Sequence, residues 1–174
     1  MSETIERNGY VLFWLGGNCP VQAEGLIDGH SLYFRARGSQ WSLTIGNDGG
    51  REPPLFGYIE NWGTWPDAGY MSDVTALSMI DKAVTRYREE RPKRIGRDDA
   101  RWTPHVLRAW SEGRFGTVQA KECLGVDDDQ LEALAASLEF AISPYHRAYK
   151  EAVALLAKGA GATEVQSSHV PVPR

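Results

Sequence analysis

Four carboxylates stand close together in the C-terminal half of the chain, at Asp127, Asp128, Asp129 and Glu132. Asp127, with Gln130 three residues later, has the spacing of a capping box, in which both side chains bond the backbone at a helix start. A calcium loop instead needs oxygen ligands at alternating positions around a glycine turn, so we expect no metal here. The cluster indicates either an acidic surface that docks a protein or caps and solvated charge on a helical hairpin.

A second candidate set consists of Tyr33, Arg35 and Arg37, at alternate positions of a predicted strand. Alternate residues of a strand point to the same face of a sheet. Arginine and tyrosine are enriched where proteins recognise other molecules, so this face is a candidate surface for an anion or a protein partner. The alternative is a solvated outer face on which Arg35 leans toward Glu24, because such exposed ion pairs are commonly incidental.

The other reactive residue types form no recognisable site. Cys19 and Cys123 are far apart and fit no metal or redox spacing. The four histidines are scattered, without a second histidine or an acidic residue at ligand spacing. The sequence therefore predicts no catalytic residues, no metal and no cofactor.

Two turn signals place the arginines in an antiparallel β-meander. Asp28-Gly29 is the preferred pair for a two-residue hairpin turn, and it predicts that Ile27 pairs with His30. Gly38-Ser39 suits a second such turn. This register makes one face of the sheet apolar and the other polar, and the polar face carries the arginines.

The flanking segments complete the predicted sheet. Residues 1–9 are polar and are expected to be frayed. Tyr10 to Leu15 is an uninterrupted apolar run, which predicts a strand covered on both faces. Leu55 to Glu60 is a candidate for a further strand, giving about 4–5 strands in residues 1–69.

Residues 70–159 are predicted to be helical and to pack on or beside the sheet, while residues 160–174 are predicted to be a flexible tail. The first helix is expected from Asp73 to about Glu90, with Ser72 as its cap and with apolar residues at helical spacing. It is the predicted cover for the apolar face. The later helices are expected to span Thr103 to Glu112, Thr117 to Leu124, and Asp127 to about Ile142. Ser143-Pro144 is expected either to restart or to kink this last helix, which continues to Gly159. The predicted fold class is thus α+β.

The segment from Thr117 to Leu138 resembles a helix-turn-helix, with Leu124-Gly125-Val126 at the turn. In that motif the start of the second helix lies beside DNA phosphates. Here those positions hold the four carboxylates, which oppose binding to a polyanion. The basic 91–101 segment is therefore the one place where we expect nucleic acid to be able to bind.

Composition limits the function classes. With 19 basic and 23 acidic residues, the 174-residue chain has a net charge of −4, which argues against general nucleic-acid affinity. The longest apolar run is too short to span a membrane, and no signal pattern precedes it, so a cytoplasmic protein is the expectation. The sequence leaves a homo-oligomer open.

Three functional hypotheses follow. The first is a non-enzymatic inhibitor, adaptor or regulator that binds a protein through the acidic helical surface, the polar sheet face or both. The second is a transcription-associated regulator with a helix-turn-helix-like unit. The third is a small enzyme with an anion-binding cleft between sheet and helices, and the absence of any catalytic triad or ligand cluster in the sequence ranks it last.

Overall fold

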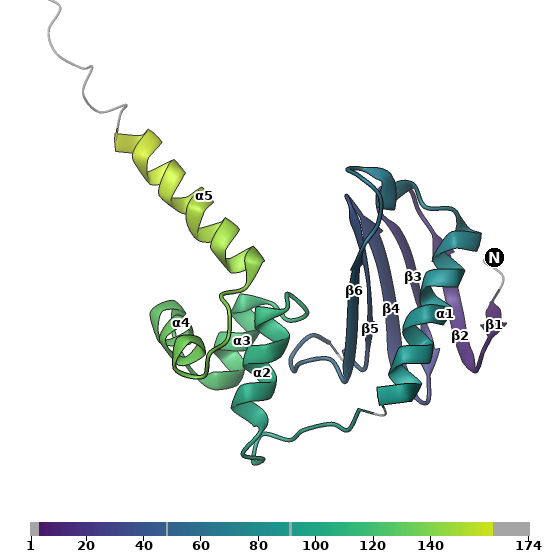
Figure 1. Ribbon diagram of the computed structural model, residues 1–174, viewed down its shortest axis with the longest axis horizontal. Helices are drawn as coiled ribbons and strands as arrows, with labels where there is room; N and C mark the ends of the chain where they lie inside the picture. Colours follow the sequence, from purple (N-terminus) through teal and green to yellow (C-terminus); the bar gives the residue numbers. More distant parts are fainter. Residues whose placement is uncertain (1–3, 48, 91, 162–174) are drawn as a thin grey trace, which may run out of the picture.

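The computed structural model describes residues 4–47, 49–90 and 92–161 and confirms the α+β fold class. One antiparallel sheet contains six strands in the order of the sequence, so each strand pairs with its neighbours in the chain (Figure 1). The strands are β1 (Ile5–Arg7), β2 (Tyr10–Gly16), β3 (Val21–Ile27), β4 (His30–Arg37), β5 (Gln40–Ile45) and β6 (Phe56–Asn61). A short 3-10 helix, η1 (Asp67–Tyr70), follows the sheet.

The predicted register of the meander is confirmed. Ile27 pairs with His30 across a turn in which Asp28 and Gly29 have φ angles of 50° and 76°, as a two-residue turn of this hand requires. Gly38 adopts a φ of 66° in the second turn. The resulting pairs include Ala23 with Phe34, Ala36 with Trp41, and Leu32 with Ile45.

The apolar face of the sheet packs against the first helix, α1 (Asp73–Glu90), which lies across it in Figure 1. Ile80, Val84 and Tyr87 of this helix are buried in the same core as the inner residues of the strands. The Ser72 hydroxyl accepts a hydrogen bond of 3.2 Å from the Thr75 amide, as expected of a helix cap. The predicted covering helix is therefore confirmed.

The prediction of a frayed N-terminus is wrong for the part of it that the structure describes. Residues 5–7 form β1, and the Asp81 carboxylate of α1 anchors the β1–β2 hairpin by accepting hydrogen bonds from three side chains. Arg7 donates at 2.7 Å, Asn8 at 2.8 Å and Tyr10 at 2.9 Å. A carboxylate 74 residues away from Arg7 holds this segment, and local polarity could not indicate that.

The prediction that β2 is covered on both faces is also wrong. Alternation from the buried Tyr10 and Leu12 places Phe13 on the outer face, where it is 51% exposed. The register of β2 against β3 shifts between Leu12 and Trp14, which turns Trp14 onto the same face, where it is 38% exposed. An extra residue in one strand of a pair is a β-bulge, which bends the strand and redirects its side chains. The outer face of the sheet near β2 and β3 consequently presents large apolar side chains.

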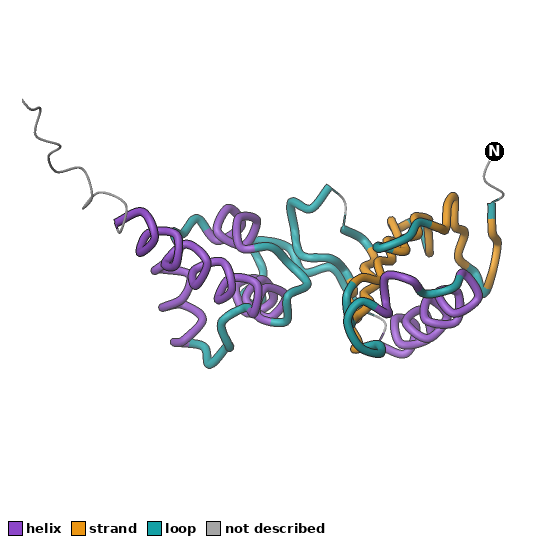
Figure 2. The backbone as a smooth tube through the Cα atoms, turned by 90° about the horizontal axis from the view of Figure 1, so that it is seen from above, coloured by secondary structure: helices purple, strands orange, loops and turns teal. Residues whose placement is uncertain are grey.

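The other helices form a second core, which loops connect to the sheet (Figure 2) and which lies on the side of β6 (Figure 1). They are α2 (Trp102–Ser111), α3 (Thr117–Leu124), α4 (Asp128–Ser137) and α5 (Pro144–Gly161). Trp110, Leu107 and Leu131 are fully buried in this core. The two cores thus divide the chain after α1, so α1 belongs structurally with the sheet.

Three predicted helix boundaries differ from the observed ones. The helix α2 begins at Trp102, one residue before the predicted start, because the Trp102 amide bonds the Asp99 carbonyl in the preceding turn. The helix α4 ends at Ser137, followed by Glu139 with a φ of 61°, so it does not extend to Ile142. The helix α5 continues to Gly161, and the rest of the predicted tail lies outside the described residues.

Candidate functional site

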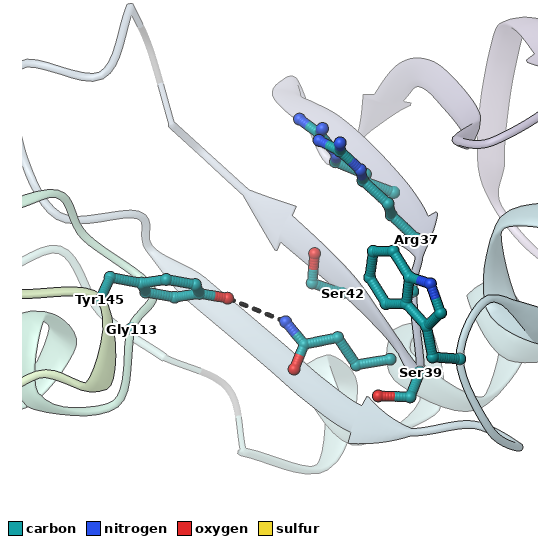
Figure 3. Close-up of a pocket in the computed structure, with 9 residues that line it drawn as sticks. Arg37, Ser39, Ser42, Gly113 and Tyr145 are labelled. Carbon is teal, nitrogen blue, oxygen red and sulfur yellow. Dashed lines mark hydrogen bonds between the residues drawn. The ribbon is translucent and has the colours of Figure 1, made fainter. Parts of the chain in front are cut away.

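A cleft lies where the outer face of β4 and β5 meets the start of α5, with a cavity volume of about 490 Å³ (Figure 3). We refer to it as the arginine cleft. Its lining residues are Arg35, Arg37, Gly38, Ser39, Gln40, Ser42, Trp65, Gly113 and Tyr145. Two of the three residues predicted on the sheet, Arg35 and Arg37, therefore line one cavity.

Strand alternation places the cationic wall of the cleft. Arg35 and Arg37 are two residues apart on β4 and point to the outer face, while Phe34 and Ala36 between and beside them are buried inside. Ser42 of β5 pairs with Arg35 and offers a hydroxyl beside it. Among the described residues, no carboxylate forms an ion pair with either arginine. The ion pair between Arg35 and Glu24, which the sequence offered as an alternative, does not form.

The opposite wall comes from the helical unit. The Gln40 side-chain amide donates a hydrogen bond of 2.8 Å to the Tyr145 hydroxyl, and Figure 3 shows the Tyr145 ring reaching toward the sheet. The Trp65 indole lies over Gly38, where an added Cβ would be 2.6 Å from the ring, and the indole is 72% exposed. An exposed indole beside two guanidinium groups can stack on a planar or apolar group of a ligand.

Tyr33 shares the outer face with the arginines but does not line the arginine cleft. The Gln22 side-chain amide donates a hydrogen bond to its hydroxyl. Its ring instead borders a second hollow of about 370 Å³ together with Phe13 and Leu26. Phe13, Trp14 and Leu26 are each more than a third exposed, and we refer to these three residues as the apolar patch.

Comparison of the chain with protein-family models, with curated proteins and with solved structures finds no match. The chemistry of the outer face must therefore be inferred from its own residues. The sequence identified the arginines but not the apolar patch. The local signal for the apolar patch is the apolar run of β2, and such a run predicts a strand that is covered on both faces.

The predicted acidic surface is largely engaged within the helical unit. Asp127 caps α4 by accepting a hydrogen bond of 2.8 Å from the Gln130 amide, which confirms the capping box. Asp128 forms an ion pair with Lys121 at 3.0 Å. Within the described part of the chain, Asp129 has no hydrogen bond or ion pair.

Glu132 links α4 to α5. Its carboxylate contacts Lys150 at 2.6 Å and the buried His146 ring at 2.8 Å. The hydrogen bond from Lys150, followed by that from His146, lowers the pKa of Glu132 below its ordinary value. Of the four predicted acidic residues, three thus have structural contacts inside the helical unit.

The basic 91–101 segment is partly neutralised. Arg94 and Arg97 lie 3.6 and 3.5 Å from the Glu52 carboxylate. Arg101 contacts Asp99 at 2.6 Å, and the hydrogen bonds from Arg101 lower the pKa of Asp99 to about 2. Position 91 lies outside the described residues.

The described residues contain no group of three metal-ligating side chains and no helix of sufficient length and apolarity to cross a membrane. Cys19 and Cys123 are free thiols, and the Cys123 thiol donates to the Arg51 carbonyl at 3.1 Å. The helix α5 exposes large apolar side chains along its length, and a homo-oligomer stays a prediction. These side chains are Tyr145, Tyr149, Val153, Leu155 and Leu156.

Proposed function

We propose that the chain is a non-enzymatic binding protein whose outer sheet face recognises the acidic surface of a protein partner. The arginine cleft receives a carboxylate of that partner, and the apolar patch packs against its apolar side chains. One observation carries this proposal. Exposed aromatic residues occupy the same face of one sheet as two arginines that form no ion pair with a carboxylate of the described residues.

The composition of this face supports protein recognition. Tryptophan, tyrosine and arginine dominate the binding energy of protein interfaces, and aromatic residues are enriched there relative to other surfaces. Phe13 and Trp14 are exposed on the outer face, and the exposed Trp65 lines the arginine cleft together with Arg35 and Arg37. A guanidinium binds a carboxylate through two parallel hydrogen bonds, so an acidic partner is the complementary one.

The lining of the cleft supports binding rather than catalysis. Its described residues include no carboxylate, histidine or cysteine. A serine nucleophile is activated by an adjacent base such as histidine or a carboxylate, and the described lining offers no such base to Ser39 or Ser42. The third hypothesis, a small enzyme, included an anion-binding cleft. In our proposal the arginine cleft keeps this anion-binding role, and the anion is a carboxylate of the protein partner.

Photo-crosslinking in the native cell tests this proposal. A benzoylphenylalanine placed at Phe13 should yield a crosslinked protein, because that side chain is 51% exposed on the proposed interface. The matched control is the same group at Val74, which is 80% exposed on α1 and remote from the outer face. Adding Arg35→Gln and Arg37→Gln should remove the Phe13 adduct. An adduct that persists in this variant, or that forms equally from position 74, would overturn the proposal.

A further inference from the structure

A second basic cavity lies between β6 and α2, separate from the arginine cleft. Its volume is about 460 Å³, within the range typical of small-molecule sites. Its lining includes Glu90, Lys93, Arg101, His105, Arg108 and Arg114. A smaller hollow of about 220 Å³ adjoins it and shares Ile95, Arg101, His105 and Arg108.

His105 lines this cavity and lies within the electrostatic influence of several arginines. Arg101 and Arg108 stand four residues before it and three residues after it, so all three side chains share one face of α2. Burial, followed by the positive charges of Arg114, Arg108 and Arg94, lowers the pKa of His105. The imidazole is therefore neutral at pH 7, although it is surrounded by cations.

Some of the cationic side chains that line the cavity form an ion pair with a carboxylate of the described residues, and two do not. Arg114 is held by Glu112, and Arg101 by Asp99. Glu90 is the only acid among the described lining residues, and Arg86 lies 3.7 Å from it. By contrast, no described carboxylate forms an ion pair with Lys93 or Arg108. A cavity lined by two such cations attracts an anion.

Arg114 and Gly57 both line the cavity, and the Arg114 side chain packs closely against the Gly57 backbone. The Arg114 side chain crosses Gly57 of β6, where an added Cβ would collide with it. Arginine, lysine and imidazole donors thus reach the cavity from three segments of the chain. A phosphate group matches this set better than a carboxylate, because it carries up to two negative charges and three strong acceptor oxygens.

We propose that the cavity between β6 and α2 binds the phosphate group of a small anionic ligand. Lys93 and Arg108 supply the charge, and His105 donates to a phosphate oxygen once it is protonated. This site is independent of the arginine cleft, so its failure in a test leaves the proposed function unaffected.

The titration of His105 in the full-length protein, followed by NMR, tests this proposal with inorganic pyrophosphate as the probe. Its resonance is assigned by its absence in His105→Gln. Pyrophosphate should raise the pKa of His105 saturably by about one pH unit, because it adds an opposite charge at hydrogen-bond distance. Sodium chloride at matched ionic strength is the reference, because salt alone screens the neighbouring arginines.

Matched variants distinguish pyrophosphate binding in this cavity from nonspecific electrostatic attraction to cationic side chains elsewhere on the surface. Lys93→Gln with Arg108→Gln should weaken pyrophosphate binding at least about tenfold, the effect of losing charge-assisted hydrogen bonds. Arg147→Gln, on the exposed face of α5, should leave binding unchanged. A pKa of His105 that moves no further than in matched chloride, or equal binding by the double variant, would overturn the proposal. A shift caused by a single-stranded oligonucleotide but not by pyrophosphate would also overturn the assignment to a small ligand.

Discussion

The side chain of Gln40 on β5 donates a 2.8 Å hydrogen bond to the hydroxyl of Tyr145 in the first turn of α5, across 105 residues of sequence. The sheet and the helical unit have separate hydrophobic cores, and this bond is one of the contacts that join them, together with the packing of Arg114 over Gly57 of β6. The bond between Gln40 and Tyr145 also closes one end of the arginine cleft, because both residues line it. The shape of the proposed binding face therefore depends on how the two units are held together.

Replacing Tyr145 with Phe removes this hydroxyl and keeps the ring. Because the side chain is more than half exposed, we expect the free energy of unfolding to fall by less than about 1 kcal/mol. Crosslinking from position 13 should weaken as the cleft wall loosens. Tyr149→Phe on the same helix is the control, since no described residue forms a hydrogen bond with its hydroxyl. Equal effects of the two variants on crosslinking and stability would contradict this, because they would show that the loss does not depend on the Gln40–Tyr145 hydrogen bond.

Gly25 is needed where β2 bulges toward β3. An added Cβ there would collide with the Val11 carbonyl oxygen and with the Leu12 backbone. We expect Gly25→Ala to lower the free energy of unfolding by about 2–3 kcal/mol, as overpacking against the backbone does. Urea denaturation measures this change. Gly96→Ala, at a position with no atom near the added Cβ, should change stability by less than about 0.5 kcal/mol.

Asp81 should make stability depend on pH in the acidic range. Partial burial raises the pKa of Asp81, but the hydrogen bonds from Arg7, Asn8 and Tyr10 outweigh that effect and lower it overall. The contribution of the carboxylate is therefore present above the unfolded-state value of about 3.9 and is lost as the pH falls through the lower folded-state pKa.

The variant Asp81→Asn isolates this contribution. We expect it to lower the free energy of unfolding by about 1–2 kcal/mol at pH 7, since it weakens charge-assisted hydrogen bonds. The wild-type protein should lose this advantage progressively as the pH falls below the unfolded-state value of about 3.9. Urea denaturation at intervals of pH measures the difference. A difference between the two proteins that stays constant over this range would contradict the assignment.

The aspartates at the start of α4 should have unequal effects on stability. Asp127→Ala removes the cap on the Gln130 amide and should cost about 1 kcal/mol. Asp129→Ala removes an exposed carboxylate that has no contact among the described residues, so its effect should lie within about 0.5 kcal/mol. Thermal unfolding followed by circular dichroism compares the two variants. A larger loss for Asp129→Ala would show that this residue has a contact of its own.

The meander could be derived from the sequence because its determinants are local. Asp28-Gly29 and Gly38-Ser39 each set a two-residue turn, and each turn fixes which residues face each other. Once that register was fixed, strand alternation placed Arg35 and Arg37 on the outer face. The caps at Ser72 and Asp127 were equally local, and both are confirmed.

The errors arose where distant residues decide the outcome. The strand β1 is held by Asp81, which no pattern in residues 1–9 reveals. The exposure of Trp14 depends on a register shift against β3 that the apolar run of β2 does not reveal. The arginine cleft needs Tyr145 beside Gln40, and this arrangement follows from the packing of the helical unit against the sheet.

The most direct test of the proposed function compares two charge variants in capture experiments from nuclease-treated native cell extract. Arg35→Gln with Arg37→Gln alters the outer sheet face, and Asp128→Asn with Asp129→Asn alters the acidic helical end to a similar extent. Circular dichroism should first show that both variants are folded. We predict that the protein captured by the wild-type chain is retained by the aspartate variant and lost by the arginine variant. Capture that survives in the arginine variant and disappears in the aspartate variant would contradict the proposal and would place the interface on the helical unit.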